Sequence, residues 1–189
     1  TFANYITINI SSPNTPGLRD FHDHSTLKNL LKDINDFTKK NNINKPLALK
    51  VSPDIENSEI GSIIESIKKF KINALIISNT TDKNRDNLIG INKSETGGLS
   101  GEPLSNISNN LIKKFYRETK GDIIIIGVGG ISSGLSAYEK LKSGANLLQL
   151  YTGMVYEGPG IVKKIKSELI DILLKEKVKN IREIVGTSS

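Results

Sequence analysis

The chain has 189 residues, which is enough for one domain or for part of a larger one. With 37% hydrophobic and 24% charged residues, its composition is that of a globular domain, which excludes a disordered tail, a collagen-like fibre and a coiled coil. The net charge of +6 suits a nucleic acid, an anionic membrane or a phosphorylated ligand, and the absence of cysteine excludes disulfides, thiolate metal sites and a cysteine nucleophile.

Short runs rich in β-branched residues alternate with helical patterns along the chain. The runs, each predicted to be a strand, are residues 5–10, 46–51, 72–78, 122–126 and 147–151. Apolar residues at helical spacing follow each run, with N-caps expected at Ser25 or Thr26 and at Asn57 or Ser58, and with later helices through Phe115, through Leu141 and over residues 161–177. A short last turn is expected over residues 181–185.

A strand followed by a helix, repeated along the chain, predicts an α/β fold with a parallel sheet. Two architectures fit this pattern. One is a doubly wound open sheet, and the other is a (β/α)8 barrel, which typically needs about 250 residues. No linker rich in Pro, Gly or Ser divides the sequence, so we expect a single domain over residues 1–189.

Polar residues gather just after the predicted strands, which is where parallel α/β proteins bind their ligands. They are Asn9, Ser11, Ser12 and Asn14 after the first strand, Lys50 within the second, Ser78, Asn79 and Thr80 after the third, residues 127–130 after the fourth, and Tyr151 and Thr152 after the fifth. We therefore expect these residues to converge on one edge of the sheet.

The sequence GVGGISSG, residues 127–134, joins the fourth strand to the next helix. Glycines let the backbone approach an anion, and a helix N-terminus supplies N–H donors, so the turn is interpreted as a phosphate-binding site. The alternative is a tight turn that binds nothing. The pattern is neither a Rossmann GxGxxG nor a Walker loop.

Lys50 interrupts an apolar strand. Because an unpaired buried ammonium is costly, it is expected to face the negative charge of a ligand, and the alternative is a lysine on an edge strand that reaches water. The long connection from Asn79 to Leu104 has a Gly- and Ser-rich end, residues 95–101, which suggests a loop that closes over a ligand; the alternative is an exposed insertion. His22 and His24 are expected at the surface, and no metal site is expected.

Six stretches resemble the dihydroorotate dehydrogenases, specifically the class 2, quinone-linked enzymes. They are NISSPNTPGLRD (9–20), Lys50, SNTT (78–81), ETGGLSGEPL (95–104), GVGGISSG (127–134) and QLYTGMVYEGPG (149–160). The stretches occur in the family's order and cover nearly the whole chain.

The resemblance implies a (β/α)8 TIM barrel with FMN at its C-terminal mouth, of which this chain supplies strands four to eight. The first three units, with the N-terminal helices through which this class makes peripheral membrane contact, are expected to precede the visible chain. The implied activity is oxidation of dihydroorotate to orotate with quinone as electron acceptor, in pyrimidine biosynthesis. The implied location is the cytoplasmic face of a bacterial inner membrane, or a mitochondrial inner membrane as the alternative. No nucleic acid partner is expected, since aromatics do not interleave with the basic runs.

Site roles carry over position by position from the resemblance. Ser12 matches the catalytic base, with Thr15 as a candidate relay for its proton. Asn9, Asn14, Asn79 and Thr80 match substrate-binding positions. The positions that match FMN contacts are Asn9, Lys50, Ser78, Gly101, Gly130, Tyr151 and Thr152, with Lys50 against the N1–C2=O region of the flavin.

Two other interpretations stay open. One is a different FMN-dependent barrel oxidoreductase, of the dihydropyrimidine or tRNA-dihydrouridine type, which a catalytic cysteine would favour; this sequence contains none. The other is an inactive fragment that needs a partner chain.

Overall fold

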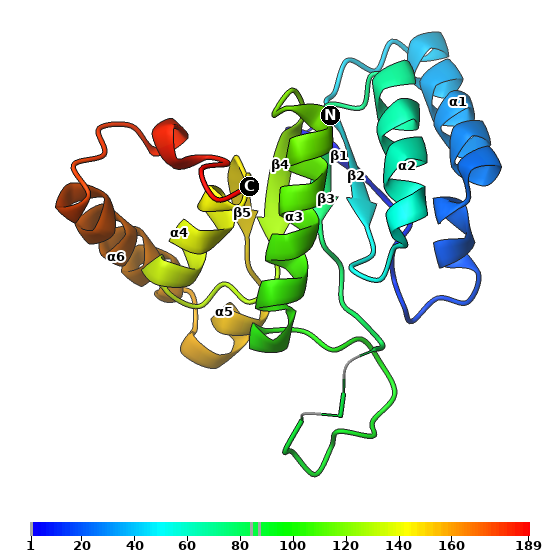
Figure 1. Cartoon of the computed structure of the whole chain (residues 1–189). Coiled ribbons are helices and arrows are strands. Elements are labelled where there is room, and N and C mark those ends of the chain that lie inside the picture. The colour runs from blue at the N-terminus through cyan, green and yellow to red at the C-terminus, as the bar shows by residue number, and fades with distance from the viewer. Residues whose placement is uncertain (1, 84, 87) are drawn as a thin grey trace.

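The computed structural model describes residues 2–83, 85–86 and 88–189 (Figure 1). Its strands are β1 (Ile6–Asn9), β2 (Leu47–Val51), β3 (Ala74–Ile77), β4 (Ile124–Val128) and β5 (Leu147–Gln149). Its α-helices are α1 (His24–Lys40), α2 (Asn57–Lys69), α3 (Ser105–Thr119), α4 (Gly134–Lys142), α5 (Thr152–Glu157) and α6 (Ile161–Lys175). Three 3-10 turns complete the order: η1 (Leu18–His22), η2 (Glu102–Leu104) and η3 (Ile181–Ile184). The predicted strands are all confirmed, whereas the short helix α5 was not predicted.

The order of the strands decides between the two architectures. All neighbouring strands are parallel, and their order in the sheet is β1-β2-β3-β4-β5. A doubly wound sheet reverses its strand order at a switch point and carries helices on both faces. This order does not reverse, and Figure 1 shows α1, α2, α3 and α4 on the same side of the sheet. The arrangement is that of consecutive units of a barrel.

The sheet is also strongly curved. The Nε2 of Gln149, on β5, donates a hydrogen bond of 2.8 Å to the hydroxyl of Tyr5, just before β1. These residues belong to opposite edges of the sheet, and a flat sheet with strands about 4.8 Å apart would separate its outermost strands by about 19 Å. The two edges therefore bend toward each other across the inner face, as the wall of a barrel does.

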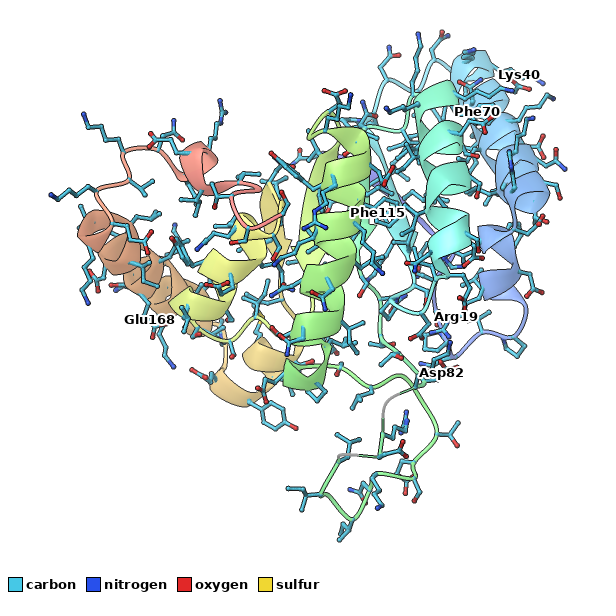
Figure 2. All side chains as sticks on the ribbon, viewed as in Figure 1. Arg19, Lys40, Phe70, Asp82, Phe115 and Glu168 are labelled. Atoms are coloured by element: carbon cyan, nitrogen blue, oxygen red, sulfur yellow. The ribbon has the colours of Figure 1, made fainter. Side chains whose placement is uncertain are left out.

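The main hydrophobic core fills the space between the outer face of the sheet and the helices. Leu49, Leu75 and Ile125 point outward from β2, β3 and β4 and are fully buried. Ile63 of α2 and Phe115 of α3 pack against the same cluster (Figure 2). Alternate residues of each strand supply this core, as the period of a strand requires.

The inner face of the sheet carries a much smaller buried cluster. It consists of Ala48, Ala74, Ile76 and Ile126, with Val128 packed against it. Ile124 and Leu147, the first residues of β4 and β5, also belong to this inner face, and they are 48% and 56% exposed. A closed barrel would cover these side chains, because its interior is filled by layers from all strands.

Two sequence-based expectations about helix starts are wrong. The N-cap of α1 is Asp23, whose Oδ1 accepts from the amides of Ser25 and Thr26 at 3.0 Å each. The N-cap of α2 is Glu56, which forms a capping box with Glu59. A carboxylate accepts hydrogen bonds more strongly than a hydroxyl and is favoured by the helix dipole. Accordingly, hydrogen bonds from Ser25 and Thr26 lower the pKa of Asp23 to about 2.

His22 is buried, which corrects the expectation of a surface residue, whereas His24 is exposed. The turn η1 places the ring of His22 beneath the β2–α2 connection. There the amide of Ser52 donates to Nε2 at 3.3 Å, and Nδ1 lies 2.8 Å from the carbonyl oxygen of Arg19. An amide can only donate, so Nε2 is unprotonated and the proton sits on Nδ1. Both ring nitrogens are therefore satisfied inside the protein.

Candidate functional site

A cavity of about 440 Å³ opens at the C-terminal edge of the sheet. Most of the predicted site residues line it, namely Lys50, Ser78, Asn79, Thr80, Gly101, Gly130, Tyr151 and Thr152. Of the remaining three, Asn9 is the last residue of β1, whereas Ser12 and Asn14 lie on the β1–η1 connection, and none of the three belongs to this lining. The predicted convergence on one edge is thus confirmed for residues from β2 through the end of β5.

On one side of the cavity the wall is made of backbone. Gly130 has a φ of +72°, and a Cβ there would lie 2.5 to 2.9 Å from atoms of Ser105, the first residue of α3. Only glycine fits both the conformation and the space. The β4–α4 turn is therefore pressed against the start of α3, at the edge of the cavity.

The turn that the sequence predicts as a phosphate site, residues 127–134, leads into α4. The start of α4 is satisfied internally, because the amides of Ser132 and Ser133 donate to Ser136 Oγ at 3.0 Å and that of Gly134 donates to Glu168 Oε2 at 2.6 Å. Figure 2 labels Glu168 on α6, which packs along α4. These three amides already have acceptors within the protein, and the phosphate site predicted at residues 127–134 stays a prediction.

The short helix α5 also begins at the cavity, with the predicted cofactor contact Thr152 as its first residue. Thr152 and Gly153 form its first turn, where backbone N–H groups have no acceptor within the helix. Both residues line the cavity, as do Gly129 and Gly130. A phosphate site made by the last two βα turns and a short extra helix is a recurring feature of TIM barrels. The sequence TGMVYE, directly after the fifth strand, is the signal from which helix α5 could have been predicted.

Lys50 lines the same cavity from the inner face of the sheet. Its strand β2 lies between β1 and β3, so the edge-lysine interpretation is wrong. Partial burial lowers the pKa of Lys50 from its usual value. Within the described ranges, no carboxylate forms an ion pair with it. The ammonium is thus available for an anionic group in the cavity.

The opposite side of the cavity is made of side chains. The Nδ2 of Asn79 donates to Asn9 Oδ1 at 3.3 Å and to Ser11 Oγ at 3.0 Å, while its Oδ1 accepts from the amide of Thr80 at 2.8 Å. These bonds join the end of β1 to the end of β3. The side-chain amide of Asn9 keeps two N–H groups on Nδ2 that can bind a carbonyl or carboxylate oxygen.

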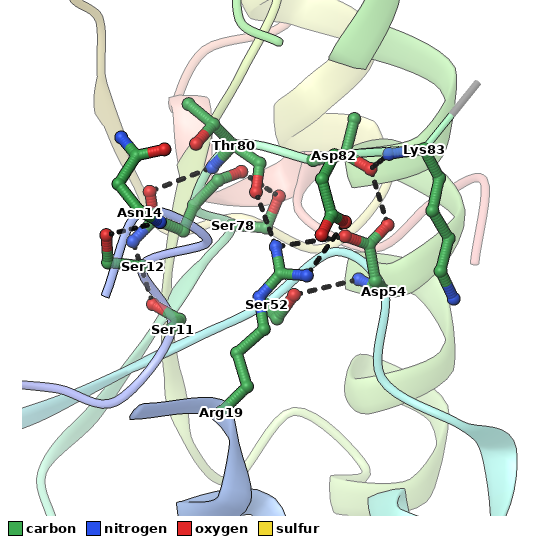
Figure 3. Close-up of polar contacts among 12 residues, drawn as sticks. Ser11, Ser12, Asn14, Arg19, Ser52, Asp54, Ser78, Thr80, Asp82 and Lys83 are labelled. Atoms are coloured by element: carbon green, nitrogen blue, oxygen red, sulfur yellow. Dashed lines mark hydrogen bonds and ion pairs between the residues drawn. The ribbon is translucent and has the colours of Figure 1, made fainter. Parts of the chain in front are cut away.

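Ser12 lies on the β1–η1 connection next to this network (Figure 3). Its Oγ accepts a hydrogen bond of 3.2 Å from the amide of Asn14, and the residue is half-buried. The side chain of Asn14 is exposed. The catalytic role of Ser12 and the binding role of Asn14 stay predictions.

The long connection after β3 lies only partly at the cavity. An antiparallel bridge between Thr81 and Leu99 closes its base, and Ser100 and Gly101 line the cavity beyond the bridge. The described residues 88–97 project away from the sheet (Figure 1). Arg85 fastens this projection by donating to the carbonyl oxygens of Glu95, at 2.7 Å, and Gly97.

The comparisons with known proteins agree with this geometry. The sequence model of the family described as "Dihydroorotate dehydrogenase" matches residues 1–173. The chain belongs to the dihydroorotate dehydrogenase family. It is 42% identical to the dihydroorotate dehydrogenase (quinone) of Trichodesmium erythraeum, over 99% of this chain and 50% of that protein. It is 40% identical to the mitochondrial dihydroorotate dehydrogenase (quinone) of Arabidopsis thaliana, over 98% of this chain and 41% of that protein.

A solved structure gives the same result in three dimensions. The crystal structure of DHODH from Eimeria tenella in complex with ferulenol superposes with a TM-score of 0.92 and 32% identity, over 99% of this chain and 54% of that one. The predicted family and the predicted fold, five consecutive units of a TIM barrel, are confirmed. The chain spans about half the length of the curated dihydroorotate dehydrogenases it matches.

Proposed function

We propose that the protein carrying this chain oxidises dihydroorotate to orotate in pyrimidine biosynthesis, with FMN as cofactor and a quinone as final electron acceptor. One observation carries the proposal. Five of the six stretches that resemble the family, far apart in the sequence, contribute residues to one cavity at the C-terminal edge of the sheet, and Asn79 of that lining binds Asn9 and Ser11 of the sixth. The chain that brings them together is 42% identical to a relative named dihydroorotate dehydrogenase (quinone).

The residues present fit FMN. The backbone side of the cavity offers amides of Gly130 and Thr152 to a phosphate, and no side chain larger than glycine fits at position 130. Lys50 offers a cation to the electron-rich part of an isoalloxazine ring. Ser78, Gly101 and Tyr151 complete the lining on which the ring and ribityl chain would rest. FMN, when bound, would supply the redox chemistry by accepting a hydride.

The side-chain half of the site suits a pyrimidine. Asn9, Asn14, Asn79 and Thr80 would bind the polar edge of dihydroorotate, whose carbonyl, N–H and carboxylate groups need both donors and acceptors. The Asn79 bonds to Asn9 and Ser11 hold these groups in fixed positions before the substrate arrives. Preorganised donors of this kind stabilise charge that develops on a substrate carbonyl.

Ser12 would remove the proton from C5 of the substrate. A serine hydroxyl is a weak base, so its environment must favour the oxygen that carries negative charge. The amide of Asn14, which donates to Ser12 Oγ at 3.2 Å, provides one such interaction. Thr15 would pass the proton onward to solvent, because its position three residues away on the same connection is exposed.

The quinone and the membrane belong to the same proposal. The matched relatives include bacterial proteins and a mitochondrial one, each named for quinone. None of the helices in the described part of this chain is long and apolar enough to cross a membrane. Peripheral contact with a bacterial inner membrane, through segments outside this chain, is the location we propose, with the mitochondrial inner membrane as the alternative.

The test is a purified full-length protein that contains this chain. We expect flavin absorption bands, and orotate formation from dihydroorotate when a short-chain ubiquinone is the acceptor. Dihydrouracil and dihydrouridine-containing tRNA serve as competing substrates. Turnover of either in place of dihydroorotate would support another flavin barrel enzyme, and a protein without flavin would contradict the proposal.

A further inference from the structure

The connection that carries Ser12 is an arch that approaches the residues just before the cavity lining, with Pro13 near Gly98 and Asn14 near Gly97. Residues 12–17, here called the Ser12 arch, are half-buried or exposed. Among the described residues their hydrogen bonds are local: the amides of Asn14, Leu18 and Asp20 donate to Ser12 Oγ and to the carbonyl oxygens of Thr15 and Gly17, respectively. At its first end the arch is held by the bonds of Ser11 and Asn9 to Asn79. What fixes its second end decides how well Ser12 is positioned.

The second end is held by Arg19, on η1. Its Nη1 donates to Asp82 Oδ1 at 2.9 Å, and its Nη2 donates to the carbonyl oxygen of Thr80 at 3.2 Å and lies 3.1 Å from Asp54 Oδ2 (Figure 3). Arg19 therefore connects the arch directly to the backbone of Thr80, a residue of the cavity lining. One guanidinium joins the connections that follow β1, β2 and β3.

The partners of Arg19 are themselves firmly held. The side chain of Asp54 is only 6% exposed, and its Oδ1 accepts a hydrogen bond of 2.6 Å from Thr81 Oγ1. Its amide donates to Ser52 Oγ at 3.1 Å. The carbonyl oxygen of Arg19 accepts from His22, which also binds the amide of Ser52. The bond from Arg19 also lowers the pKa of Asp82, which favours the charged form of that carboxylate.

We propose that Arg19 is a positioning residue that fixes the distance between Ser12 and Thr80, and so between the base and the substrate-binding side chains. The inference rests on the proposed function. Arginine suits this place because the N–H groups of its planar guanidinium can bind two carboxylates and a carbonyl oxygen at the same time, which a lysine cannot do with the same geometry. Since a misplacement of about 1 Å can slow a reaction about 100-fold, loss of the connection should be felt in the chemical step.

The test compares variants of the full-length protein by anaerobic stopped-flow reduction of the flavin with dihydroorotate. Arg19→Gln alone leaves Asp54 buried without a counter-charge, so the main variant is the double one, Arg19→Gln with Asp54→Asn. We expect its limiting reduction rate to fall about 10- to 100-fold with normal flavin content and spectrum. Arg19→Lys should recover part of the rate, and Arg182→Gln, at an exposed position, should leave it unchanged.

Hydrogen exchange without substrate gives a second readout. Amides of residues 13–18 and 80–83 should exchange faster in the double variant, whereas those of β4 and α4 should not change. A wild-type reduction rate in the double variant would overturn the proposal by showing that Arg19 has no role in positioning. Loss of flavin in proportion to activity would overturn it too, because the role of Arg19 would then be a general structural one. Wild-type protein that binds flavin but is not reduced by dihydroorotate would refute the proposed function, and exchange would then decide alone whether Arg19 holds the arch.

Discussion

The two sides of the cavity are built in different ways. The side that we propose binds the cofactor, here called the cofactor side, is formed by Gly129, Gly130, Thr152 and Gly153, and it consists of backbone held in place by close packing against α3 and α6. The side that we propose binds the substrate, here called the substrate side, is formed by Asn79 and Thr80 of the lining with Asn9 and Ser12 beside them. It consists of side chains held by polar bonds, with Asn79 bound to Asn9 and to the amide of Thr80, and Ser12 bound to the amide of Asn14. A packed backbone is sensitive to added volume, whereas a polar network is sensitive to charge and pH.

The largest expected effect is at the cofactor side. Gly130→Ala adds a Cβ against the backbone of Ser105 at a φ of +72°, so the turn must move and its amides with it. We expect purified protein to lose nearly all of its flavin, measured as the ratio of visible to ultraviolet absorbance. Gly160→Ala is the matched control, because a Cβ there meets no atom within 4 Å. Full flavin content in Gly130→Ala would show that this turn does not hold the cofactor.

At the substrate side, Ser12→Ala should leave flavin content intact and slow flavin reduction by about 10²–10⁴-fold, the usual contribution of a general base. Ser12→Cys should keep part of the rate and shift activity to lower pH, since a thiol ionises more readily than a hydroxyl. Stopped-flow reduction across pH measures both. Wild-type rates in Ser12→Ala would mean that the base lies elsewhere.

Lys50 lies between the two sides and should show an intermediate effect. Lys50→Met keeps much of the volume but removes the charge that faces the cavity. Reduction should slow by up to about 100-fold, because negative charge on the reduced cofactor loses its partner. Lys45→Met, at an exposed position just before β2, is the control. Equal rates for the two variants would make Lys50 a structural residue only.

The smallest effect concerns His22, behind the substrate side. Burial lowers its pKa below 6.5, although Arg19 O and Glu59 act in the opposite direction. The unfolded chain therefore binds a proton more readily, so the stability from neutral His22 is present above pH 6.5 and is lost as the pH falls toward the folded pKa. Urea unfolding should show a weaker pH dependence between pH 7 and 5 in His22→Gln than in wild type or in His24→Gln. An unchanged dependence in His22→Gln would exclude this role.

Much of this arrangement could be predicted from sequence because it depends on local patterns. Apolar periodicity predicts the strands and helices, and with them the edge of the sheet at which the polar residues lie. Lys50 could be singled out because it is a charge within an apolar run. The acceptor of the Gly134 amide at the start of α4 could not be predicted, because Glu168 reaches it only through the packing of α6 against α4. Arg19 was not singled out, since its partners Thr80 and Asp82 lie 61 and 63 residues away.

The central claim is that this cavity oxidises dihydroorotate with a bound flavin. Its most direct test is an anaerobic titration of the full-length protein with dihydroorotate, without quinone. We expect the flavin absorbance to bleach with one orotate formed per flavin, and quinone to restore the oxidised spectrum. A flavin that stays oxidised in the presence of excess dihydroorotate would contradict the account.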